Sequence, residues 1–178
     1  MAKLKKAALL FLVPIITVSL LWAQDTATQT VTMQVREICV IDVTGNPSPL
    51  IIVPPSNGGD MPANPSDNTT YAQYTSVVAQ GKTRSITAHW GANDSAPSGC
   101  ELKLEATPAG GNQGSSAGEI TLSTTPQNIV TGIRSCATGS DSSNGAQLTY
   151  TLVIKDVESL VAGEEKTVTV TLTLTDDA

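Results

Sequence analysis

Three cysteines are the residues of this 178-residue chain whose chemistry is easiest to define. Cys100 opens an expected strand at 100–106, and Cys136 lies in an expected loop at 134–145. We predict a disulfide between them, which would close a loop of about 37 residues and contribute roughly 3–4 kcal/mol on the chain-entropy view. Cys39 is then an unpaired thiol. Its place on an apolar strand face favours a buried small hydrophobe, and an intermolecular bridge is the alternative.

Metal and general-base chemistry have few candidate residues. The sequence contains no C-x-x-C spacing, and His89 is its only histidine. His89 has the opposite parity to Ile86, Ala88 and Trp90, so we expect it on the solvent side of its strand. No G-x-S-x-G motif supplies a nucleophilic serine. The sequence therefore predicts a protein that is not an enzyme and has no catalytic or zinc site.

Oxygen-rich loops leave calcium as a candidate ion. Several acids lie among Asn, Ser and Gly, namely Asp60, Asp67, Asp94 and Asp141. Carboxylate and carbonyl oxygens are the ligands that calcium prefers, but the spacing of these acids is not that of a calcium-binding loop. Asn, Asp, Ser and Gly are also ordinary turn residues. We expect no cofactor, with calcium as the open alternative.

Short alternating or apolar runs predict the elements that position these residues. The expected strands are 26–43, 50–53, 71–79, 82–90, 100–106, 119–123, 128–133, 146–155 and 167–175. Gln80-Gly81 predicts a hairpin between the third and fourth of them, and 156–165 has room for one helical turn. Nine short strands with turn residues between them are typical of an all-β fold, an antiparallel immunoglobulin-like β-sandwich.

Two charged residues fit this pattern poorly. Glu37 has the parity of the apolar residues Val35 and Cys39 in the first expected strand, so we expect a bulge or a crossing between sheets near it. Arg84 has the parity of the inward Ile86. Because it is charged, we nevertheless expect it at the exposed start of its strand. The final Asp176-Asp177 pair is expected to end the last strand with solvated charge.

The first 23 residues predict export. Three lysines precede an apolar run of about 15 residues, which is shorter than the ~20 residues that span a bilayer. We expect a signal peptide at 1–23, one β-sandwich domain at 24–178, no membrane span after cleavage, and a secreted, periplasmic or cell-surface location. Without the leader the net charge is 7 − 16 = −9. This acidity argues against nucleic acid as a partner.

The two ends of the remaining chain alternate in the same way. "TVTMQV" at 30–35 places Val31, Met33 and Val35 on one face, and "TVTVTLTLT" at 167–175 does the same with Val and Leu. A terminal strand can pair within its own sheet or complete the sheet of a neighbouring molecule. Alternation fits both arrangements, because it determines the buried face and not the partner. The N-terminal stretch is the better candidate for exchange, since the polar residues before it have no expected partner.

With its leader, alternating ends and Thr-rich, aromatic-poor body, the chain resembles secreted bacterial β-sandwich surface subunits of the pilin-like or immunoglobulin-like kind. The resemblance implies a structural or adhesive role. We therefore expect a non-enzymatic exported structural or cell-surface protein, in its most specific form a fibre or matrix subunit that self-associates through its terminal strands. The alternative is a ligand- or carbohydrate-binding accessory module that uses its Gly/Asn/Asp-rich loops at 56–70, 91–99 and 107–118.

Overall fold

The computed structural model describes residues 26–177, and the predicted leader at 1–23 lies outside them. Within the described residues no helix reaches seven residues, and none is long and apolar enough to cross a membrane. Residues 26–34 and residues 35–177 fall into two separate units. All strands belong to the second unit, so the fold described below is that of residues 35–177.

Ten strands form two antiparallel sheets in the described chain. The first sheet has the order β1-β2-β9-β4-β6, with β8 also paired to β2. Its strands are β1 (Ile38–Val43), β2 (Ser66–Val77), β9 (Ala146–Ile154), β4 (Cys100–Thr107), β6 (Ile120–Thr121) and β8 (Cys136–Ala137). The second sheet has the order β10-β3-β7-β5. Its strands are β10 (Val170–Asp176), β3 (Arg84–Trp90), β7 (Gln127–Ile133) and β5 (Ser115–Ser116).

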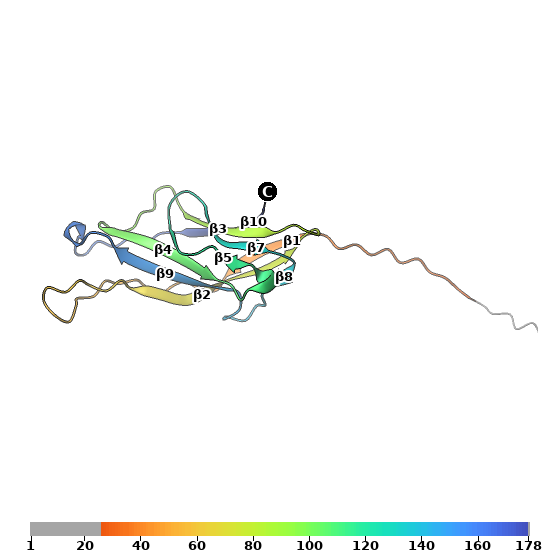
Figure 1. Ribbon diagram of the computed structural model, residues 1–178, viewed down its shortest axis with the longest axis horizontal. Helices are drawn as coiled ribbons and strands as arrows, with labels where there is room; N and C mark the ends of the chain where they lie inside the picture. Colours follow the sequence, from red (N-terminus) through yellow and green to blue (C-terminus); the bar gives the residue numbers. More distant parts are fainter. Residues whose placement is uncertain (1–25, 178) are drawn as a thin grey trace, which may run out of the picture. The chain divides into compact units, whose positions relative to one another are not determined.

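The two sheets share one apolar core, and Figure 1 shows them as two layers. Strand alternation explains which residues fill it. In β4, Leu102, Leu104 and Ala106 are at most 9% exposed, while the charged residues between them lie on the outer face. From the second sheet, Ile86 and Val130 are fully buried. An all-β fold with antiparallel sheets is thus confirmed, and two sheets around one core fit a β-sandwich.

The last strand alternates as predicted. Val170 and Leu172 are half-buried and Leu174 is buried, whereas the threonines between them are exposed. β10 pairs with β3 along its whole length, from Val170 opposite Trp90 to Asp176 opposite Arg84. The helical turn expected at 156–165 is also present, as a 3₁₀ turn at Val157–Ser159.

Three local predictions were wrong. The segments around Gln80-Gly81 are not a hairpin, because β2 belongs to the first sheet and β3 to the second. Residues 50–53 form no strand, although Leu50 packs against the core. The first strand begins at Ile38 and not at residue 26. In each case the apolar pattern did not determine whether the segment pairs or with which strand.

Candidate functional site

The most exposed apolar side chains of the described chain lie in the N-terminal segment. Val31, Met33 and Val35 are 66%, 87% and 84% exposed, and residues 26–37 adopt no regular secondary structure. Five residues with three large apolar side chains at every second position have the pattern of a half-buried strand. These three side chains are the ones that the sequence singled out for strand exchange.

A second set of incompletely covered apolar residues lies where the two sheets meet at β1 and β10. The inward-facing positions of β1 are Cys39, Ile41 and Val43. Val43 is 40% exposed and Ile41 is half-buried. The inward parity of β10 and the residues just before it is Val168, Val170 and Leu172, all half-buried. We call these six residues the open seam. The inward residues of the central strands β4 and β9 are far better covered.

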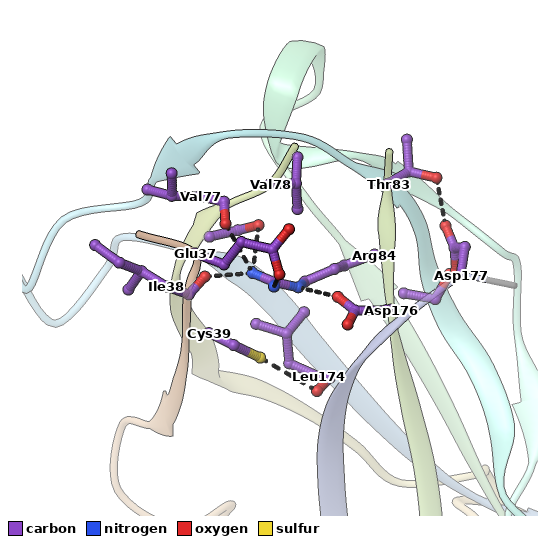
Figure 2. A network of polar contacts seen from close by, with 12 residues as sticks. Glu37, Ile38, Cys39, Val77, Val78, Thr83, Arg84, Leu174, Asp176 and Asp177 are labelled. Carbon is purple, nitrogen blue, oxygen red and sulfur yellow. Dashed lines mark hydrogen bonds and ion pairs between the residues drawn. The ribbon is translucent and has the colours of Figure 1, made fainter. Parts of the chain in front are cut away.

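The open seam is closed at one end by Arg84. This side chain is only 3% exposed, so the predicted exposed strand start was wrong. Its Nε lies 2.5 Å from Asp176 Oδ1, and its Nη1 donates to the backbone oxygen of Ile38. Nη1 also lies 3.4 Å from both Ser76 Oγ and the backbone oxygen of Val77. Figure 2 shows the guanidinium between β10 on one side and β1 and β2 on the other.

The buried guanidinium also accounts for Glu37. Its Oε2 lies 3.7 Å from Arg84 Nη2, so the charge that interrupts the apolar parity of the first predicted strand pairs with another charge. The hydrogen bond with Asp176 raises the pKa of Arg84, against the opposing effect of burial, and nearby Cys39 and Glu37 act in the same direction as Asp176. Arg84 therefore remains a cation and ties together the start of β1 and the end of β10.

Asp177 extends this network. Its two carboxylate oxygens accept hydrogen bonds, one from Thr83 Oγ1 at 2.6 Å (Figure 2) and one from Ser85 Oγ at 2.5 Å. A surface hollow beside the network is lined by Glu37, Val78, Lys82, Thr83, Asp176 and Asp177. Asp176 and Asp177 thus bind the side chains of Thr83, Arg84 and Ser85, and are not only the solvated charge that the sequence indicated.

The predicted disulfide between Cys100 and Cys136 is absent, and all three cysteines are free. Cys100 lies opposite Ile154 in β9, whereas Cys136 lies opposite Ser76, beyond the other end of the β2–β9 ladder. The nine residues from Ala146 to Ile154, which are eight steps along the strand, alone span about 26 Å. A disulfide needs Cα atoms about 4.4–6.8 Å apart. The strand register therefore excludes this pairing within the chain.

The three thiols have different surroundings. Cys39 is exposed and not buried, contrary to its place on the apolar strand face, and its Sγ donates to the backbone oxygen of Leu174 at 3.4 Å. Cys100 and Cys136 are half-buried. Burial raises the pKa of both thiols, with Glu164 adding to the effect at Cys100. Of the three, Cys39 is the thiol most open to reagents.

The remaining candidate residues are not brought together. His89 is half-buried on the outer face of β3, and its Nδ1 has no hydrogen-bond partner in the described structure. Asp94 Oδ2 accepts from the backbone N–H of Gly91 and of Thr169, so it stabilises a turn. Asp67 in β2 likewise accepts from Thr69. Residues 26–177 contain no group of three or more His, Cys, Asp or Glu that could hold a metal ion.

Comparisons with models of known protein families, with curated proteins and with solved structures find no match to this chain.

Proposed function

We propose that this chain is an exported, non-enzymatic structural protein of the cell surface, a fibre or matrix subunit whose copies associate by strand pairing. The observation that carries the proposal is the exposure of Val31, Met33 and Val35 on one face of an unpaired segment. Transferring such side chains out of water favours association by roughly 1.5–3 kcal/mol each when burial is complete. A strand donated to a neighbour buries them and satisfies its backbone groups at the same time.

Two features of the chain support this role over a catalytic one. The candidate residues for chemistry are dispersed, and two of the candidate acids, Asp94 and Asp67, accept hydrogen bonds from nearby backbone N–H groups. The two sheets pack around one apolar core, as a structural scaffold requires. The proposal includes an immunoglobulin-like arrangement of the sandwich and cleavage of the leader after Ala23, with the product outside the cytoplasm.

Export and assembly of the full chain test the proposal together. The chain is expressed with its own leader in a bacterial host, and the culture is fractionated. We expect a product of residues 24–178 by intact mass, recovered outside the cytoplasm. In concentrated samples, negative-stain microscopy is expected to show filaments or a regular series of oligomers. Retention of the uncleaved chain in the cytoplasm, or a monomer at every concentration, contradicts the proposal.

A further inference from the structure

We propose that the open seam is the acceptor, and that residues 28–36 of a second copy fill it by pairing with the free edge of β10. The inference rests on the proposed function and names the surface that function needs. An exposed edge strand presents a row of unpaired N–H and C=O groups, which is a template for another strand. Three features favour this partner: the free edge of β10, the side chains beside it and the charge of the entering segment.

The hydrogen-bond phase of β10 shows which backbone groups are free. Asp177 N donates to Thr83 O at 3.0 Å, so these opposed residues bond to each other. Bonded and non-bonded pairs alternate along an antiparallel ladder, so the N–H and C=O of Leu172 and Val170 point away from β3. Trp90, opposite Val170, agrees with this phase, because its N–H donates instead to Ser123 O. Of the inward apolar residues of β10, Val170 and Leu172 therefore also have free backbone groups.

The seam is free over a limited length. At one end the Cys39 thiol occupies Leu174 O, and Arg84 joins Asp176 to Ile38. Toward residue 168 none of the hydrogen bonds or ion pairs among residues 26–177 covers the free edge. The stretch from Val168 to Leu172 is five residues, or about 16 Å. The stretch from Val31 to Val35 is also five residues, with the same period of two.

The two free edges at the seam are not equivalent. On β1, the ladder phase set by Thr44 N to Tyr71 O leaves the N–H of Val43 on the free side. That N–H is already bound to Asp42 Oδ1 at 2.8 Å. On β10, none of the described hydrogen bonds occupies the free side at Val170 or Leu172. This difference favours β10 as the strand that receives the segment.

Charge favours the same occupant. The entering residues 28–36 contain Arg36 and no acid, for a net charge of +1, and Asp25 of the processed chain lies three residues before them. Residues 37–178 contain six basic and fifteen acidic residues, for a net charge of 6 − 15 = −9. The segment of one copy is therefore attracted to the body of another, although the two bodies repel each other, and this attraction weakens as salt rises.

A peptide test separates the acceptor from the assembly. The receptor is the full processed chain carrying V31T, M33T and V35T, which removes its own apolar donor residues and leaves the seam intact. The probe is a synthetic peptide of residues 27–36, and the reporter is Trp90, the only Trp after residue 23, which lies opposite Val170. We expect a saturable blue shift of Trp90 emission. A peptide with Thr at 31, 33 and 35 is expected to bind at least tenfold more weakly.

Variants of the receptor test whether the peptide binds at β10. Leu172→Lys puts a charge on the inward side of the seam, and we expect at least tenfold weaker binding of the native peptide. Thr173→Lys, one residue further on the exposed face, is the matched control and should change binding by less than twofold. Circular dichroism checks the fold of both variants. If Leu172→Lys does not fold, Leu172→Thr replaces it, and the native and Thr-substituted peptides still test the inference on the unaltered seam.

The outcomes distinguish the inference from the proposed function. Failure of the native peptide to bind overturns the seam as acceptor, even if the full chain forms filaments. Equal binding to the Leu172 and Thr173 variants overturns it as well. Peptide binding that is lost only in the Leu172 variant supports the seam. If that result comes with a full chain that stays monomeric, the acceptor stands and the fibre role fails.

Discussion

The thiol of Cys39 donates a hydrogen bond to the backbone oxygen of Leu174 across 3.4 Å and so ties β1, the first strand, to β10, the last. Arg84 reinforces the same end of the seam through Ile38 and Asp176. The inward residues further along both strands, such as Ile41 and Leu172, are only half-buried. The seam between β1 and β10 is therefore closed at the end near Arg84 and open along the rest of its length.

Replacing Arg84 with Met should destabilise the fold strongly. The change removes the guanidinium that donates to the backbone oxygens of Ile38 and Val77, and the loss of a buried ionic partner costs about 3–5 kcal/mol. We expect a value near 3 kcal/mol in urea unfolding, because Asp176 and Glu37 are 71% and 58% exposed and water can solvate them.

Lys103→Met is the matched control for this change. Lys103 Nζ lies 2.6 Å from Glu119 Oε1, so the contact is as short as that of Arg84, but both side chains are partly exposed. Surface pairs contribute about 0–1 kcal/mol. Equal losses of unfolding free energy for the two variants would show that Arg84 is not a structural node.

The cysteines should react in a definite order. Cys39 is exposed, whereas the pKa of Cys100 and of Cys136 is raised by burial, which lowers their thiolate fraction at neutral pH. We expect iodoacetamide to modify Cys39 first in the native chain, as measured by peptide mass mapping over time. After oxidation, mapping without reductant should yield no Cys100–Cys136 peptide. Recovery of that linked peptide from folded monomer would contradict the strand register.

Two core tyrosines should make the fold sensitive to alkali. Burial raises the pKa of Tyr150 from 10.0 to about 12, and burial also raises the pKa of Tyr74. Because the folded pKa is higher than the unfolded one, their contribution to stability is complete below pH 10 and is lost as the pH rises toward 12. Unfolding free energy measured in this window should fall, and tyrosinate absorbance should rise together with unfolding. Ionisation of all three tyrosines near pH 10 in a folded chain would exclude the burial of this pair.

Replacing Tyr150 with Phe provides the control for the alkaline transition. The ring stays in the core and the ionisable hydroxyl is removed. We expect the variant to retain more of its stability between pH 10 and pH 12 than the parent chain does. An identical pH profile for both would assign the alkaline loss to other groups.

The sequence predicted the strands well where both faces of the pattern were clear. β4, β9 and β10 have strict alternation, and their inward residues are those expected, such as Leu104, Leu148 and Leu174. Alternation determines the buried face of a strand because successive side chains point to opposite sides. It carries no information on the neighbour, which is why the hairpin at Gln80-Gly81 and the strand at 50–53 were predicted wrongly.

Arg84 and the cysteines show the other limit of the pattern. Arg84 shares the parity of Ile86, so alternation places it inward, but the cost of burying a charge argued for an exposed position. Its partners Asp176 and Glu37 lie 92 and 47 residues away in the sequence, so only the fold reveals them. The pairing of Cys100 with Cys136 failed for the same reason. A favourable loop length does not reveal that two cysteines lie at opposite ends of a sheet.

The central claim is that Val31, Met33 and Val35 join one copy of the chain to the next. Its most direct test is size-exclusion chromatography with light scattering on three forms of the processed chain over a range of concentrations. They are the parent, the V31T/M33T/V35T variant, and an I51T/V53T/M61T variant that changes three other exposed apolar residues. We predict oligomers that grow with concentration for the parent and for the second variant, and a monomer for the first. Assembly of the V31T/M33T/V35T variant to the same extent as the parent would contradict the claim.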